Sequence, residues 1–327
     1  MAHTPIAVYT DYDELDIAPG IAMLEEHGWD VRVLGTRDHQ VIIEAAQDAT
    51  ALMVGYATVD AAMIDALPQV QILSLLSMGF DNVDLEHAAR RGVWVTNVPG
   101  AATREVAEHT LALALNLGRR VHRFHAGVRR GEWRLNAAPT PMNLAGTTCS
   151  VIGFGRIGRE FARLAAPVFR EVLVFDPFVD ALSPDDEARG IRLVGFEEAL
   201  RGGEIVSLHM PLTPETDKLL AADQLALLPH GAQLINVSRG ELLDEPALLR
   251  ALDSGQLGGA ALDVLTVEPP SQDSSLVHHE NVIVTPHIGF LSERTALEYP
   301  LVQACNAIAL LETGRPLNPV NEPHPPR

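Results

Sequence analysis

The sequence predicts an α/β protein with two domains, each built on a parallel β-sheet that carries helices on both faces. A chain of 327 residues is long enough for two domains of ordinary size. Short apolar runs alternate with segments of helical periodicity along most of the chain. This alternation is typical of parallel sheets, in which a helix connects one strand to the next.

The first hundred residues predict one complete α/β unit. Five apolar runs are expected to be strands: Ile6–Tyr9, Val31–Leu34, Ala51–Val54, Ile72–Leu76 and Val93–Thr96. Helical patterns lie between them at Ala18–His27, Val41–Asp48 and Leu85–Arg91. Gly28 and Gly92 directly follow two of these patterns, where glycine commonly ends a helix.

The rest of the chain predicts a second α/β unit and a final helix. A long helix from Thr103 to Arg120 precedes an irregular segment at Gly127–Ala145. The expected strands are Cys149–Ile152, Val172–Phe175, Ile205–Leu208, Gln233–Val237, Ala260–Val264 and Val282–Thr285, with helices near Ala221–Leu228 and Pro246–Leu252. A last helix, Ser292–Glu312, should end at Gly314. The proline-rich tail Pro316–Arg327 is expected to be extended or disordered.

A glycine-rich turn opens the second unit and has the spacing of a dinucleotide-binding site. Gly153 allows a tight turn out of the strand, Gly155 allows backbone to approach a pyrophosphate, and Gly158 allows close packing of helix on strand. Arg156 and Ile157 begin the helix, whose N-terminal N–H groups favour phosphate. A glycine pattern of this kind also occurs in plain loops. Here the strand, helix and second strand that the site requires all follow in order.

Asp176 ends that second strand and predicts which nucleotide the turn accepts. A carboxylate in this place can accept hydrogen bonds from the adenosine ribose diol. The same charge would repel a 2′-phosphate, so NAD is favoured over NADP.

Composition and charge exclude several classes of partner. The net charge of −19 makes nucleic acid and anionic lipid unlikely partners, and an acidic substrate would need local positive charge at its site. For most of these residues the acidity serves solubility or a high-salt habitat. No apolar run approaches the roughly 18 residues of a membrane helix, and the first residues do not resemble a signal peptide. Two cysteines indicate no disulfide framework, so we expect a cytoplasmic protein, and we assign no metal site.

Three ionisable residues stand just after expected strands of the second unit: Arg239, Glu268 and His287. Ligands of open α/β sheets bind beyond the carboxyl ends of the strands. Arg239 can bind a carboxylate with two hydrogen bonds, and His287 can exchange a proton with an alkoxide. Glu268 beside His287 would orient the ring and stabilise its protonated form. Each residue alone could be structural, but together behind a nucleotide site they suit hydride transfer to a 2-oxo acid.

Taken together, these stretches resemble the D-isomer-specific 2-hydroxyacid dehydrogenase family over nearly the whole chain. The matching segments are Ser77–Asp84, Val106–Glu108, Gly153–Gly158, Leu208–Thr213, Asn236–Gly240, Ala261–Val264 and Thr285–His287. The family's catalytic Arg, Glu and His fall on Arg239, Glu268 and His287 without substitution. The resemblance implies an NAD-dependent oxidoreductase acting on a small D-2-hydroxy acid or 2-oxo acid of the glyoxylate, hydroxypyruvate or pyruvate type.

The resemblance also implies roles that composition and periodicity do not indicate. Cofactor contacts are expected from the glycine turn and Asp176 and, further along the chain, from His209, Met210, Pro211, Thr216, Val237, Ser238, Asp263 and Gly289. Ser77, Met78 and Gly79 should bind the substrate together with Arg239 and His287, with backbone N–H groups near Met78 and Gly79 holding its carboxylate. Asp263 should bond the nicotinamide carboxamide, although it could also merely end a strand.

Domain borders and assembly follow from the same resemblance. A Rossmann NAD-binding domain, residues 99–287, is expected to be inserted into a flavodoxin-like substrate domain formed by residues 1–98 and 288–327. Members of the family are commonly homodimers joined through the cofactor domains. The region Ala101–Asn143 would then serve as the dimer arm.

Two other functions stay open at this point. Asn116–Arg120 and Asp176–Phe178 resemble the C-terminal binding protein branch of the family, in which an NAD(H)-sensing scaffold acts with little turnover. That branch typically carries Trp where this chain has Phe290, so the likeness is partial. Oxidation of phosphite or formate is a third possibility, and Ser77–Met78 offers no extra cation for phosphite.

Overall fold

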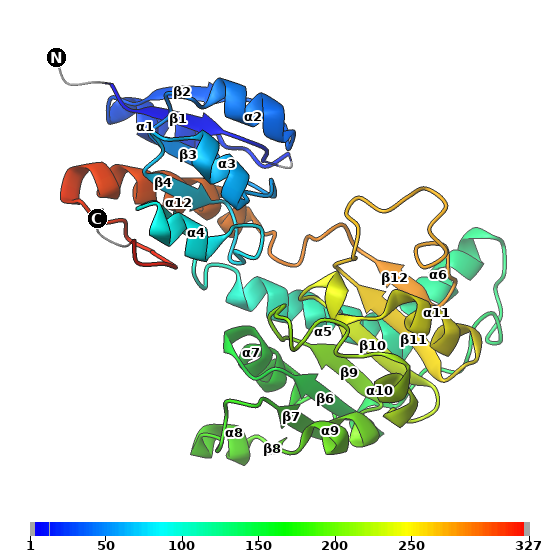
Figure 1. The fold of residues 1–327 in the computed structure, drawn as a ribbon. Coiled ribbons are helices and arrows are strands. Elements are labelled where there is room, and N and C mark those ends of the chain that lie inside the picture. The colour runs from blue at the N-terminus through cyan, green and yellow to red at the C-terminus, as the bar shows by residue number, and fades with distance from the viewer. Residues whose placement is uncertain (1–3, 13, 324–327) are drawn as a thin grey trace. The chain divides into compact units, whose positions relative to one another are not determined.

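The computed structural model describes residues 4–12 and 14–323, and it divides the chain into two compact units. Unit 1 comprises residues 1–102 and 291–327, and unit 2 comprises residues 103–290. Unit 1 is therefore discontinuous in sequence, because the chain leaves it after its fifth strand and returns for the last helix (Figure 1). Within the described ranges, we find no helix that is both long and apolar enough to span a membrane.

Unit 1 contains a five-stranded parallel sheet of order β2-β1-β3-β4-β5, the flavodoxin-like order with one switch point between β1 and β3. Its strands are β1 (Ile6–Tyr9), β2 (Asp30–Val33), β3 (Ala51–Val54), β4 (Ile72–Leu75) and β5 (Trp94–Thr96). Its helices are α1 (Ala18–Glu26), α2 (His39–Ala45), α3 (Ala61–Ala66), α4 (Leu85–Arg90) and α12 (Glu293–Thr313). All five expected strands are confirmed to within a residue or two.

Helices cover both faces of this sheet because its strands are apolar on both sides. One core contains Val8, Leu52 and Leu73 from the strands, packed with residues of α2, α3 and α4. On the other face α12 packs on α1 and β4, although it is the last helix of the chain (Figure 1). There the Ser74 hydroxyl donates to the Gln303 carbonyl at 2.9 Å, so a buried polar contact also fixes α12 on the sheet.

Unit 2 contains a seven-stranded parallel sheet of order β12-β11-β10-β9-β6-β7-β8. The strands are β6 (Thr148–Ile152), β7 (Glu171–Phe175), β8 (Ile191–Leu193), β9 (Ile205–Leu208), β10 (Ala232–Asn236), β11 (Leu257–Leu262) and β12 (Val282–Val284). Counted from β6, the strand order is the dinucleotide-binding order 3-2-1-4-5-6 with one strand added. The predicted Rossmann topology is confirmed, and its switch point lies between β6 and β9.

Two helical layers enclose this second sheet. One layer contains α5 (Thr103–Arg119) and α7 (Arg156–Ala165), and the other contains α9 (Phe196–Gly202), α10 (Ala222–Leu227) and α11 (Glu245–Asp253) (Figure 1). Successive residues of β6 alternate between the layers, since Val151 packs toward α5 and α7 while Ile152 packs toward α9. Such two-sided burial explains the nearly continuous apolar strands of the sequence.

The structure corrects several local expectations. Gly127–Arg129 is helical, because α6 (Val121–Arg129) extends into the segment expected to be irregular. The short elements α3, α8 (Pro184–Ala188), β8 and α9 carry too few residues for a clear periodic signal. The tail was expected to be extended or disordered, and one hydrogen bond ties its described part to β5: Val320 donates its amide to the Val95 carbonyl at 2.9 Å. Residues 324–327 of that tail lie outside the described residues.

Candidate active site

The glycine turn lies at the carboxyl end of β6, at the switch point of the unit 2 sheet. Gly153 has a φ of +102°, and a Cβ there would lie 2.5 Å from the His209 carbonyl oxygen. A Cβ on Gly158 would lie 1.9 Å from the Gly153 carbonyl oxygen. Neither position accepts a side chain, because the first helical turn packs directly on the loop and the loop packs on the end of β9.

Gly155 differs from these two glycines, and the difference points to a ligand. A Cβ on Gly155 would meet no atom within 4 Å, and its φ of −71° suits any residue. Gly155 is the N-cap of α7 and provides no side-chain cap, so the helix begins at exposed Arg156 and half-buried Ile157 with N–H groups available for phosphate. The space beside Gly155 therefore fits the cofactor pyrophosphate.

Asp176 follows β7 and is tied to the glycine turn. Its Oδ2 accepts the Phe154 amide at 2.8 Å, and its Oδ1 accepts the Phe178 amide at 2.9 Å. Each carboxylate oxygen keeps a second lone pair, which is the acceptor that a ribose diol needs. The expected hydrogen bonds from the adenosine ribose to Asp176 stay a prediction.

The loop after β9 packs against the glycine turn, where the His209 carbonyl faces Gly153. The His209 ring accepts or donates one hydrogen bond with Ser207 at 2.9 Å, and its Nδ1 is buried. Burial lowers the pKa of His209 to about 3, so the ring is neutral. The Met210 side chain is buried in the core. The Thr216 hydroxyl donates to the Pro211 carbonyl at 2.7 Å. The cofactor contacts expected from His209, Met210, Pro211 and Thr216 stay predictions.

Arg239 follows β10 in a turn that its neighbours hold in place. The Asn236 side chain donates to the Arg239 carbonyl at 2.7 Å and accepts the Ser238 amide at 3.0 Å. The Ser238 hydroxyl donates to the Leu208 carbonyl at 2.9 Å, which links the ends of β10 and β9. Arg239 itself is half-buried and donates from Nη1 to the Ser238 carbonyl at 2.8 Å. Val237, beside it, is also half-buried.

The structure brings the Arg239 turn against the loop that carries Glu268. A Cβ on Gly240 would lie 2.1 Å from the carbonyl carbon of Leu265, and the Leu265 amide donates to Glu268 Oε1 at 2.8 Å. Arg239, Glu268 and His287 therefore follow three neighbouring strands, β10, β11 and β12, at one edge of the sheet.

His287 and Glu268 form a hydrogen-bonded pair at this edge. The Nδ1 atom of His287 lies 2.8 Å from Glu268 Oε2, and both side chains are about one-third exposed or less. Desolvation acts to raise the pKa of Glu268, but hydrogen bonds from His287 and the Leu265 amide outweigh it and hold that pKa below its usual range. Glu268 is thus ionised at neutral pH and faces one specified ring nitrogen.

Asp263 follows β11, is almost fully buried, and holds the segment that carries His287. Its backbone carbonyl accepts the His287 amide at 2.9 Å. Its carboxylate accepts the Ile288 amide at 3.0 Å and the Gly289 amide at 2.8 Å. Desolvation raises the pKa of Asp263, but these contacts together with His109 and Thr285 hold it below its usual value. One lone pair of Oδ2 is still available for the carboxamide contact that the resemblance implies.

The loop Ser77–Gly79 follows β4 in unit 1, and its carbonyl groups are engaged within that unit. The Ser77 carbonyl accepts the Val98 amide at 2.9 Å, and the Met78 carbonyl accepts the Asn97 side chain at 2.6 Å. The Gly79 carbonyl accepts the Ser77 hydroxyl at 2.7 Å. An anionic ligand at this loop would therefore meet its N–H groups rather than its carbonyls. The expected substrate contacts of these residues stay predictions.

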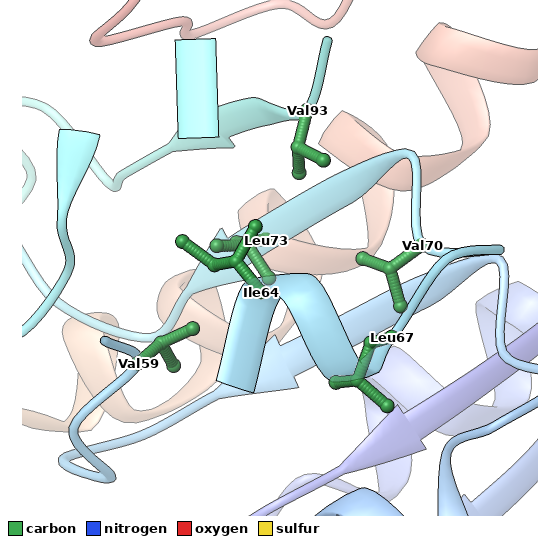
Figure 2. Close-up of a pocket in the computed structure, with 6 residues that line it drawn as sticks. All are labelled: Val59, Ile64, Leu67, Val70, Leu73 and Val93. Atoms are coloured by element: carbon green, nitrogen blue, oxygen red, sulfur yellow. The ribbon is translucent and has the colours of Figure 1, made fainter. Parts of the chain in front are cut away.

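A small apolar pocket elsewhere in unit 1 is part of the core. It lies beneath α3, and Figure 2 shows the aliphatic side chains that line it: Val59, Ile64, Leu67, Val70, Leu73 and Val93. It offers no polar group that could orient a ligand. Residues 4–12 and 14–323 contain no group of three or more His, Cys, Asp or Glu side chains that could hold a metal ion.

The sequence assigned no role to two groups of supporting residues. His109 and Thr285 contact Asp263 from elements far apart in the chain, and Asn97 contacts Met78 from the neighbouring strand. A lone histidine in a long helix is usually structural. Only its place opposite Asp263, which the sheet determines, distinguishes it.

Comparison with known proteins bears on the fold and the family of the chain. Residues 111–289 match the model of the D-isomer specific 2-hydroxyacid dehydrogenase, NAD binding domain. Glyoxylate reductase of Korarchaeum cryptofilum is 34% identical over 312 residues, which cover 93% of this chain and 92% of that protein. D-3-phosphoglycerate dehydrogenase 2 of Arabidopsis thaliana is 41% identical over 243 residues, covering 74% of this chain. The matched part spans only 38% of that relative's length.

A solved structure also covers both units. D-lactate dehydrogenase of Aquifex aeolicus, crystallised with NAD and lactic acid, superposes with a TM-score of 0.87 at 25% sequence identity. The superposition covers 97% of this chain and 100% of that one.

Proposed function

Because this chain belongs to the D-isomer-specific 2-hydroxyacid dehydrogenase family and contains its NAD-binding domain, we propose that it interconverts a small 2-oxo acid and the corresponding D-2-hydroxy acid. In the direction of reduction, the 2-oxo acid, NADH and one proton give the hydroxy acid and NAD⁺. The observation that carries the proposal is the pairing of His287 with Glu268 at 2.8 Å, on the same sheet edge as the glycine turn.

Bound NADH supplies the hydride that adds to C2 of the substrate, and the residues of this chain do the rest. Arg239 binds the substrate carboxylate with two hydrogen bonds and polarises the adjacent carbonyl. His287 gives its proton to the carbonyl oxygen as the alkoxide develops. Because Nδ1 faces Glu268, the exchanged proton is carried on Nε2. The ionised Glu268 stabilises the imidazolium that must be present before reduction.

The proposed substrate class rests on the relatives that the chain matches and on its net charge. The glyoxylate reductase match extends over almost the full length of both chains, whereas the phosphoglycerate dehydrogenase match leaves most of that relative uncovered. We therefore propose a small acid of the glyoxylate, hydroxypyruvate or pyruvate type. With a net charge of −19, local cations are needed to attract such an acid, and Arg239 provides one.

Oxidation of NADH in the presence of a panel of 2-oxo acids tests the proposal, with NADPH as the control cofactor. His287→Ala should lower kcat by about 100- to 10,000-fold while NADH still binds, because only proton transfer is removed. Near-normal turnover of this variant would exclude His287 from proton transfer. If the wild-type protein binds NADH but reduces none of the acids, the alternative of an NAD(H)-sensing scaffold replaces the enzyme.

We also propose that the protein is a homodimer joined through unit 2. Large apolar side chains are exposed in and after α6: Val121 at 55%, Val128 at 47%, Trp133 at 88% and Leu135 at 95%. So much exposed apolar surface in one segment is typical of a protein interface. A second copy of the chain is the proposed occupant.

A further inference from the structure

We propose that His109 is a positioning residue for His287, acting through Thr285 and Asp263. The inference rests on the proposed function, because it concerns how the proton donor is held. All four residues belong to unit 2. His109 lies in α5, Thr285 follows β12, and Asp263 follows β11.

The contacts form a directed chain. The Thr285 hydroxyl lies 2.6 Å from Asp263 Oδ1 and has one proton, which it donates to the carboxylate. Its oxygen can then only accept from His109 Nε2, which is 3.1 Å away. The same nitrogen lies 3.4 Å from Asp263 Oδ1. His109 therefore carries a proton on Nε2 and shares it between the hydroxyl and the carboxylate.

This chain of contacts orients the Asp263 carboxylate, and the carboxylate orients the His287 segment. Three successive amides, those of residues 287, 288 and 289, donate to Asp263: the first to its carbonyl and the others to its two carboxylate oxygens. A rotation of the carboxylate would break two of the three bonds. His109 and Thr285 both contact Oδ1, the oxygen that also accepts the Ile288 amide, and so oppose this rotation.

His287 needs such support because its backbone is in an unfavourable region. Its φ is +53°, a left-handed conformation that is unfavourable in a non-glycine residue and persists only where the surroundings impose it. In this conformation Nδ1 of the ring lies 2.8 Å from Glu268 Oε2. Loosening Asp263 would let the backbone relax and move the His287 ring away from its reacting position.

Packing and charge reinforce the hydrogen bonds. A Cβ on Gly289 would lie 2.8 Å from Asp263 Oδ2 and 3.5 Å from His109 Cδ2, so the carboxylate leaves no room for a side chain there and the His109 ring packs close by. Asp263 is 3% exposed and also acts to raise the pKa of Glu268 by charge repulsion. The Nε2–H of His109 offsets part of that buried negative charge.

The test compares His109→Leu with His109→Gln. Leucine fills the space without a donor, whereas the Gln side-chain amide places an N–H close to the position of Nε2. We expect His109→Leu to lower kcat roughly 10- to 100-fold with a small change in KM, since a displaced catalytic group costs rate rather than binding. His109→Gln should recover most of the loss.

Two further measurements separate positioning from general damage. Thr285→Val interrupts the middle of the chain, and its effect on kcat should not add to that of His109→Leu in the double variant. His87→Leu is the matched control, because His87 also pairs with an aspartate from a helix, at 18% side-chain exposure against 20% for His109. It lies in unit 1 and should leave kcat unchanged.

Hydrogen exchange gives a readout that does not depend on turnover. Amides 287–289 should exchange faster in His109→Leu and at the wild-type rate in His109→Gln and His87→Leu. The inference would be overturned if these amides exchanged at the wild-type rate in His109→Leu. It would also be overturned if the wild-type protein were active and His109→Leu had the same kcat. An inactive wild-type protein would instead refute the proposed function, and the exchange experiment would still decide the role of His109.

Discussion

At the scale of single residues, the pair formed by His287 and Glu268 combines an unfavourable backbone with a specified hydrogen bond. His287 has a φ of +53°, and its Nδ1 lies 2.8 Å from Glu268. Glu268 is in turn tied to the Leu265 amide at 2.8 Å. The ring therefore has one nitrogen directed toward a carboxylate, which leaves Nε2 for chemistry.

Removing the charge of Glu268 should change the pH profile of reduction. The hydrogen bond from His287 holds the pKa of Glu268 below its usual range, and Glu268→Gln removes this charged partner of the proton donor, so the rate should begin to fall at a lower pH than in the wild type. The measurement is kcat/KM for the 2-oxo acid across pH. Asp65→Asn, at the His87–Asp65 pair of unit 1, is the control and should leave the profile unchanged. Coincident profiles for Glu268→Gln and wild type would contradict the pairing.

Asp176 should determine the preference for NADH over NADPH. Its oxygens hold the amides of Phe154 and Phe178, so Asp176→Asn removes the charge while one acceptor is kept. The ratio of kcat/KM for NADH to that for NADPH should fall roughly tenfold, about 1.4 kcal/mol, because repulsion of the 2′-phosphate is lost. If the ratio does not change, another residue reads the ribose.

At the scale of elements, both sheets use a buried aspartate after a strand to hold the next loop. In unit 2, Asp263 accepts the amides of Ile288 and Gly289. In unit 1, Asp11 follows β1 and accepts the amides of Tyr56 and Ala57 at 2.8 and 3.0 Å. Buried carboxylates need such donors, and the loops at a sheet's carboxyl edge have N–H groups that are not used in the ladder.

Gly155 gives a test of the glycine turn that is independent of folding. An Ala side chain there meets no protein atom within 4 Å, so the free energy of unfolding of Gly155→Ala should be nearly that of the wild type. The methyl group would enter the space proposed for the pyrophosphate, and the Kd for NADH should rise about tenfold or more, ~1.4 kcal/mol. Gly146→Ala, where the nearest atom is 3.5 Å away, is the control for an added methyl group. Equal NADH affinity in Gly155→Ala and wild type would mean that the pyrophosphate does not bind beside Gly155.

The elements that the sequence predicted best are those with long or two-sided apolar patterns. All strands of the dinucleotide unit except β8 were expected, because burial on both faces makes each a continuous apolar run. β8 has three residues, and α6 has exposed Val121 and Val128 on a helix that begins after Arg120 in the left-handed region. Short elements and helices without a buried face leave little periodicity to detect.

At the scale of the whole molecule, the exposed apolar segment around Trp133 and Leu135 predicts the assembly. Replacing both residues by Ser should convert a dimer to a monomer, because their burial against a second copy would be lost. Light scattering after size exclusion measures the mass. Phe178→Ser is the matched control, since Phe178 is 91% exposed on the same unit. A monomeric wild-type protein would refute the proposed dimer. The cytoplasmic location expected from the sequence stays a prediction.

The sequence by itself determined the fold class and the cofactor, because these depend on local patterns such as apolar strands and the glycine spacing. From the ionisable groups directly after strands it also predicted the residues with chemical roles. The tertiary structure decided which groups meet. The pairing of His287 with Glu268 was already expected from the sequence, and the structure contains it. The contact of Asn97 with Met78 depends on neighbouring strands, and the approach of His109 to Asp263 depends on α5 lying across the sheet. No local pattern encodes these contacts, since the partners are separated in sequence and are brought together only when the two faces of each sheet are buried.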